Sequence, residues 1–339
     1  MAELLITRAG PGVTIQDTGR PGYLAQGLSR GGAADALALA EGAALLEQDS
    51  SCAAIELAGS FLSIETTAPL RIALTGAPMR AISDDKVLPW HASHMLPQGA
   101  KLELSGSRGG YSYLHAGGGI DAPKILGARS AHLAAGIGRM LEPGDRLTPG
   151  TDKGRASGMA LTPQQRFAGG VLRVIATPQT QLFPEDVLAR FTATAFCKDA
   201  RGNRMGQRLV SAAQGFALPF GLSILSEAIV PGDIQITGDG APFVLLAECQ
   251  TTGGYPRIGT VLPCDLPKLV QAPAGSELRF EFVTLDMAVA TEQAEAARRA
   301  ALPRSLRPLI RDPQDIADLL SFQLISGVTS GDDLERNAV

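Results

Sequence analysis

The residues best suited to chemistry are concentrated at 250–255, which read Gln-Thr-Thr-Gly-Gly-Tyr and follow the apolar stretch 243–247. Amide and hydroxyl side chains at the end of a buried strand place neutral donors and acceptors side by side. This combination suits an amide, urea or lactam ligand, whose own donor and acceptor must both be satisfied when water is excluded. The alternative interpretation is a polar turn whose side chains satisfy one another.

A second candidate is the glycine-rich segment 10–35, which carries Asp17, Arg20 and Arg30. Glycines permit sharp turns and let backbone amides approach an anion closely. An arginine fork is the natural grip for a carboxylate or phosphate group. The alternative is a structural loop braced by pairs of aspartate and arginine residues.

A third and weaker candidate is the loop 203–208, in which Asn203 and Arg204 precede a glycine. We expect the three segments to contribute to one substrate site, although no single residue identifies itself as the catalytic acid or base. The expected substrate-binding residues are Gln250, Thr251, Thr252, Gly253, Gly254, Tyr255, Asn203, Arg204, Gln16, Asp17 and Arg20.

Other enzyme templates are missing from the sequence. His91 and His94 lie in one short segment, but no carboxylate or cysteine follows at the spacing of a metal site, so no metal is expected. The sequence contains no phosphate loop of the Gly-x-x-x-x-Gly-Lys-Ser/Thr type, no Gly-x-Ser-x-Gly elbow and no dinucleotide fingerprint. It also lacks a Met-Lys biotin-acceptor pair, so a carboxyl carrier would have to be another chain.

Composition narrows the class of protein. A formal net charge of −4 leaves no broad cationic face for nucleic acid. The N-terminus lacks the pattern of a signal peptide, and no apolar run approaches the length of a membrane span. We therefore expect a cytoplasmic protein, with its four cysteines as free thiols and no role in membranes or with nucleic acid.

The elements that must position these residues are mostly strands. Short apolar runs separated by many of the 39 glycines and 22 prolines predict a mainly β fold with some helices. Alanine-rich helices are expected at 33–48 and 287–302. The expected divisions of the chain are a first domain at 1–150, a linker at 151–170, a second domain at 171–285 and a helical extension at 286–339.

The candidate segments together resemble a carboxyltransferase family that includes the C subunit of 5-oxoprolinase, the second subunit of allophanate hydrolase, the carboxyltransferase part of urea carboxylase and a sporulation regulator that counters a kinase inhibitor. The resemblance extends over residues 4–282. Its most specific part is the polar run at 250–256, which follows a Gly-Asp-Gly turn at 238–240. Residues 116–120 and 126–130 resemble the pattern of the family's first domain.

This resemblance implies two tandem cyclophilin-like β-barrel domains, with a ligand groove between or across them and no metal. It also implies an ATP-dependent hydrolase that opens 5-oxoproline to glutamate. In that reaction this chain and a B subunit, related to a kinase inhibitor, share ATP and activate the lactam, and an A subunit finishes the hydrolysis. Two alternatives remain: carboxyl transfer from carboxybiotin to urea or a related amide, and a non-enzymatic regulator that binds a partner protein.

Overall fold

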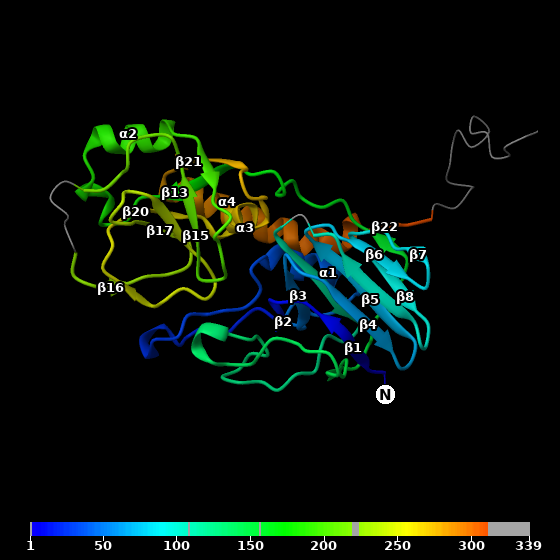
Figure 1. Cartoon of the computed structure of the whole chain (residues 1–339). Coiled ribbons are helices and arrows are strands. Elements are labelled where there is room, and N and C mark those ends of the chain that lie inside the picture. Colours follow the sequence, from blue (N-terminus) through cyan, green and yellow to red (C-terminus); the bar gives the residue numbers. More distant parts are fainter. Residues whose placement is uncertain (1, 108, 156, 219–223, 311–339) are drawn as a thin grey trace, which may run out of the picture.

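The computed structural model describes residues 2–107, 109–155, 157–218 and 224–310. The predicted mainly β fold with few helices is confirmed. In Figure 1 the sheets of the first half, in blue and cyan, lie on one side and the strands of the second half, in green and yellow, on the other. Two expectations, a helix start at Asp312 and a frayed end at 331–339, lie outside the described residues.

The first half consists of two antiparallel sheets that enclose a common apolar core. Strand β9 shows why: its Leu102 and Leu104 are buried while the residues between them are exposed, the alternation expected of a sheet with one face on the core. The six-stranded sheet is β11 (Arg146–Leu147), β1 (Leu4–Ala9), β4 (Leu62–Thr66), β9 (Lys101–Ser105), β6 (Arg80–Ser83) and β7 (Lys86–Val87). The seven-stranded sheet is β2 (Val13–Gln16), β3 (Ala54–Ala58), β10 (Tyr111–Ala116), β5 (Leu70–Gly76), β8 (Ala92–Leu96), β12 (Met159–Ala160) and β22 (Arg307–Pro308).

The second half is a closed barrel. Its core includes a cluster of aromatic rings, in which Phe191 stacks on Phe280 with centroids 4.8 Å apart and packs against Phe196 and Phe216. The barrel strands, in order, are β13 (Gly170–Ile175), β20 (Arg257–Val261), β17 (Asp233–Ile236), β18 (Pro242–Leu245), β15 (Gly206–Val210), β14 (Phe196–Lys198) and β21 (Glu277–Phe282). A separate pair, β16 (Glu227–Ala228) and β19 (Thr252–Gly253), lies beside them.

Helix α1 (Ala36–Leu45) occupies the helical segment predicted near its place in the sequence. It begins at Asp35 because that carboxylate accepts hydrogen bonds from the backbone amides of Leu37 and Ala38, both at 3.0 Å. No helix among the described residues combines the length and apolarity needed to cross a membrane. The other helices and 3-10 turns are η1 (Leu24–Gln26), η2 (Leu133–Ala135), η3 (Thr180–Leu182), α2 (Glu185–Ala193), η5 (Pro263–Asp265), α3 (Leu266–Gln271), α4 (Leu285–Ala301) and η6 (Leu302–Ser305).

The segments expected to be a linker and a C-terminal extension both contribute to the first half. Strand β12 pairs with β8 at the edge of the seven-stranded sheet, and β22 pairs with β12 after α4 has passed along the junction of the two halves. Arg166, from the same polar stretch as β12, is 2% exposed. Polar residues in these segments therefore serve packing and ion pairing, which composition alone does not distinguish from a solvated connection.

Acid should weaken the fold through His91. Burial, and secondarily Arg166, lower the pKa of His91 from 6.5 to about 4, while Asp35 acts in the opposite direction. The unfolded chain therefore takes up this proton first as pH falls, so stability is full above pH 6.5 and declines toward pH 4. The expected loss from this group is about 3 kcal/mol.

Urea unfolding between pH 4 and 7 measures this effect. His91→Asn is the informative variant, because the backbone of His91 has a φ of 53°, which asparagine tolerates. The free energy of unfolding of the variant should depend less on pH than that of the native chain. Equal slopes in the two proteins would show that His91 does not carry the effect.

Candidate functional site between the two halves

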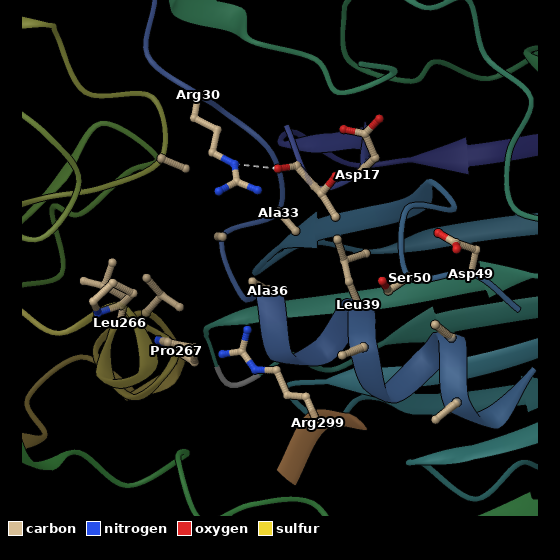
Figure 2. Close-up of a pocket in the computed structure, with 18 of the residues that line it drawn as sticks. Asp17, Arg30, Ala33, Ala36, Leu39, Asp49, Ser50, Leu266, Pro267 and Arg299 are labelled. Atoms are coloured by element: carbon tan, nitrogen blue, oxygen red, sulfur yellow. Dashed lines mark hydrogen bonds between the residues drawn. The ribbon is translucent and has the colours of Figure 1, made fainter. Parts of the chain in front are cut away.

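A cavity of about 1100 Å³ lies at the junction of the two halves. Figure 2 shows Ala36 and Leu39 of α1 along one side, with Leu266 and Pro267 of α3 facing the start of that helix. Arg299 of α4 also lines the space. Both halves of the chain therefore form its walls.

The composition of α1 explains why this space stays open. Ala36, Ala40 and Ala43 line the cavity, and their spacing of four and three residues places them on one face of the helix. Leu37 and Leu45 are buried. The short side chains on the cavity face thus leave a volume that larger residues would fill.

The polar end of the cavity is formed by Asp17, Arg30 and Arg204. Arg30 donates from Nε to the carbonyl oxygen of Thr18 at 2.8 Å, and this contact is drawn in Figure 2. Within the described part of the chain its two terminal nitrogens make no ion pair or hydrogen bond, and the residue is exposed. Arg30 is therefore a cation available to a ligand at the mouth of the cavity.

Asp17 holds its loop in place. Its carboxylate accepts hydrogen bonds from the backbone amides of Gly19 at 2.9 Å and Arg129 at 2.6 Å, and from the hydroxyl of Ser130. Its carbonyl oxygen also accepts from the Ala33 amide at 2.9 Å. The expectation of a loop braced around Asp17 and the expectation of a site residue therefore meet in one side chain, since Asp17 also borders the cavity.

Arg204 connects the barrel to the first half. Its guanidinium donates to Glu56, to the carbonyl oxygen of Gly32 and, at 2.6 Å, to Glu248. Burial lowers the pKa of Arg204, but Glu56 and Glu248 raise it more, so it lies above its ordinary value. Tyr113 in turn donates to Glu56 at 2.6 Å. The arginine thus remains charged and fixes two carboxylates at the junction.

Arg20 and Gln16 are almost completely buried and incompletely satisfied. Arg20 donates from one terminal nitrogen to the carbonyl oxygen of Ser130, but its Nη1 has no hydrogen-bond partner in the structure as described. The Oε1 atom of Gln16 is likewise unpartnered. Burial lowers the pKa of Arg20, whereas Asp17 and Glu248 act to raise it. Unused polar atoms of this kind are typical of places where a ligand or a moving group completes the hydrogen bonding.

The polar run 250–255 lies on the barrel side of the junction. Gln250 and Tyr255 are exposed, and Thr252 belongs to β19, which pairs with β16. Thr251 is buried next to the first half, with its hydroxyl 3.9 Å from the position that a side chain at Gly27 would take. None of these residues, including Gly253 and Gly254, lines the large cavity. The structure therefore brings Arg204 and Asp17 together at the cavity but places this run beside it.

Asn203 has a local function. Its side-chain oxygen accepts from the backbone amides of Met205 at 2.8 Å and Gly206 at 3.3 Å, which holds the turn that presents Arg204. The structure does not bring Asn203 itself to the cavity.

Sequence analysis missed three polar residues that build the junction, Glu56, Tyr113 and Glu248. Glu56 left a usable signal, because it is a carboxylate in the otherwise apolar strand β3 and is fully buried. Among the described residues, no group of three His, Cys, Asp or Glu side chains is arranged to hold a metal ion.

Comparison with known proteins places this architecture. The model of the carboxyltransferase domain, subdomain A and B, matches residues 26–282. The chain is 35% identical to the C subunit of 5-oxoprolinase from Escherichia coli K12 over 298 residues, which cover 86% of this chain and 94% of that protein.

Solved structures agree. TTHA0988 superposes with a TM-score of 0.75 at 28% identity, covering 83% of this chain, which spans 56% of that longer chain. Urea carboxylase of Kluyveromyces lactis superposes with a TM-score of 0.78 at 20% identity over 92% of this chain and 31% of its own, a likeness of fold. The chain is therefore a member of the carboxyltransferase family of subdomains A and B.

Proposed function

We propose that this chain is the C subunit of an ATP-dependent 5-oxoprolinase. The observation that carries the proposal is its 35% identity to a protein of that name over 94% of that protein's length. The junction between the halves supports it, because a free arginine, Arg30, borders a cavity of about 1100 Å³. Arg30 would bind the carboxylate of 5-oxoproline through its two free nitrogens.

The chemistry of a lactam explains why ATP is needed. A lactam carbonyl is a poor electrophile until its oxygen becomes a leaving group, and phosphorylation achieves this. Charge then develops on phosphoryl and carbonyl oxygens, which arginines and backbone amides stabilise. In this proposal a B subunit shares the ATP and the activation step with this chain, and an A subunit finishes the hydrolysis, in the cytoplasm where ATP is available.

The polar run 250–255 would complete the site next to the cavity. Gln250 is exposed and makes no hydrogen bond to the described residues, so its amide is free to pair with the lactam. Thr251 and Tyr255 would add hydroxyl groups to the same surface. The proposed substrate surface thus joins Arg30 and Arg204 at the cavity to the polar run on the barrel.

Carboxyl transfer to urea or a related amide is the second candidate, favoured by the shared fold with urea carboxylase. Co-expression with candidate A and B subunits distinguishes the two. ATP turnover that depends on 5-oxoproline supports the proposal. Turnover that instead requires urea, bicarbonate and a biotin carrier, with none on 5-oxoproline, would replace it with the second candidate.

Two substitutions test the binding surface in the complex. Arg30→Met should raise the KM for 5-oxoproline by about tenfold to 100-fold, the size of a lost charged hydrogen bond. Gln250→Ala should lower kcat/KM about tenfold. Both residues are exposed, so the midpoint of urea unfolding should not move. Arg279→Met, an exposed site on β21, is the matched control. Unchanged kinetics in both test variants would remove these residues from the site.

A further inference from the structure

Three side chains that the proposed function has not used meet at the junction. The Ser29 hydroxyl lies 2.8 Å from Nε2 of His132, and Nδ1 of the same ring lies 3.9 Å from Oε2 of Glu248. All three residues are 3% exposed. Ser29 and His132 belong to loops of the first half, while Glu248 follows β18 of the barrel. The arrangement therefore exists only while the two halves are joined.

We propose that Ser29, His132 and Glu248 form a proton relay that takes the N–H proton from an amide or lactam substrate. The order hydroxyl, imidazole and carboxylate is the one that activates a hydroxyl group, with the carboxylate orienting the ring. Nδ1 has no hydrogen-bond partner in the structure as described, and Glu248 is the carboxylate facing it. The hydroxyl of Ser29 then donates to Nε2, and Nδ1 carries the proton.

Glu248 is the positioning residue of the three. Its Oε1 accepts from Nε of Arg204 at 2.6 Å, and its Oε2 accepts from the backbone amide of Ala134 at 3.4 Å. These contacts leave Oε2 directed toward His132, at a distance about 1 Å longer than a hydrogen bond. Such distances commonly shorten when substrate binds.

The charges around His132 keep it able to accept a proton. Burial lowers its pKa first, Glu248 raises it, and Arg20 and Arg204 lower it again, so the pKa lies below its ordinary value of 6.5. The ring is therefore neutral at pH 7, and the imidazolium formed on proton uptake faces the carboxylate of Glu248. Nη1 of Arg20, buried and unpartnered, lies on the same side of the ring.

Gly31 links the relay to the cavity. It lines the cavity, and a side chain there would approach within 3.2 Å of Cδ2 of His132 and 3.4 Å of Nη1 of Arg20. Gly31 and Gly32 have φ values of 62° and 86°, in the left-handed region that glycine adopts without strain. One residue of main chain thus separates the cavity from the ring, and this pair of glycines permits it to move.

The step is the same for a lactam and for urea, and its assignment to a lactam rests on the proposed function. The substrate N–H proton passes to the oxygen of Ser29 as the proton of that hydroxyl passes to Nε2 of His132. Electron density left on nitrogen moves into the carbonyl group, whose oxygen then attacks the phosphoryl group of ATP. When the ring opens, the imidazolium returns the proton to the leaving nitrogen, so protons balance over the cycle.

The pH dependence of kcat/KM in the reconstituted complex tests the relay. His132→Gln should lower kcat/KM by about 100-fold or more and abolish the acidic limb of the profile. Glu248→Gln removes the carboxylate that raises the pKa of His132, so the limb should move to lower pH. His94→Gln, the same substitution at a buried histidine on β8, should leave the limb in place. An acidic limb that survives in His132→Gln overturns the relay.

A measurement without turnover separates this proposal from the proposed function. Nitrogen-15 NMR of the His132 ring in the isolated chain should show the proton on Nδ1, and a pKa that falls in Glu248→Gln. The proton on Nε2, or a pKa unchanged by Glu248→Gln, would overturn the relay even if the complex hydrolyses 5-oxoproline. The expected NMR result in a complex that acts only on urea would retain the relay and reject the lactam.

Discussion

Replacing Arg204 by methionine should lower the free energy of unfolding by about 3–5 kcal/mol, because it strands two buried carboxylates. Glu56 is completely buried and Glu248 is 3% exposed, and both accept hydrogen bonds from this guanidinium. Methionine keeps most of the volume of the side chain and removes only its charge and donors. Urea unfolding of the isolated chain at pH 7 measures the loss.

Two further variants make this result interpretable. Arg201→Met removes an arginine that is 78% exposed and paired with Asp199, and should change the free energy of unfolding by no more than about 0.5 kcal/mol. Replacing Glu56 and Glu248 by glutamine in the Arg204→Met chain should recover part of the loss, because no buried charge then remains. A loss below about 1 kcal/mol in Arg204→Met would show that the junction does not depend on this ion pair.

Arg166→Met should cost a similar amount, about 3–5 kcal/mol. Arg166 is 2% exposed and donates to both oxygens of Glu41, at 2.8 and 2.7 Å, and to Asp35 at 2.8 Å. Gln271 of the barrel donates to the same oxygen of Asp35 at 2.7 Å. Loss of the arginine therefore leaves two carboxylates of the α1 region buried, one of them shared with the second half.

The dependence of this loss on pH gives a second measure. Burial already raises the pKa of Glu41, against the lowering effect of Arg166, so removal of the arginine raises it further. Protonation relieves the stranded charge, and the difference between the native chain and Arg166→Met should therefore shrink as pH falls. Arg139→Met, at an exposed pair with Asp145, is the control. A difference that grows toward acid would contradict this interpretation of the cluster.

Much of the fold could be predicted because its local signals agree with its packing. The alternating strand at β9, the apolar strand at β5 and the capped α1 each carry their pattern in a few adjacent residues. The closure of the barrel could not be predicted in this way, because β13 pairs in parallel with β21, about a hundred residues later. The edge pairing of β12 with β22 left no signal either, since each strand is two residues long.

The candidate site was predictable only where one segment supplies it. Asp17 and Arg204 were singled out from charged residues near glycines, and both border the cavity. Asn203 was singled out by the same argument, yet its amide holds a turn, because asparagine serves both purposes with the same atoms. Contacts between Glu248 and His132, 116 residues apart, follow from the meeting of the two halves and not from any spacing in the sequence.

The interface also explains why the two halves act as one unit. Tyr111 and Tyr113 of β10 belong to the same apolar cluster as Phe191 and Leu278 of the barrel. The ion pairs of Arg204 and Arg166 lie beside this shared core. A change at the junction is therefore expected to affect both the stability of the chain and the geometry of the proposed site.

The most direct test of the proposed function follows the carbonyl oxygen of 5-oxoproline. The native chain is combined with its A and B subunits, ATP and 5-oxoproline labelled with oxygen-18 in the lactam carbonyl, and the inorganic phosphate is analysed by mass spectrometry. If that oxygen is phosphorylated, one labelled atom should appear in the phosphate for each glutamate formed. Phosphate that remains unlabelled while glutamate accumulates would contradict activation of the lactam through its carbonyl oxygen.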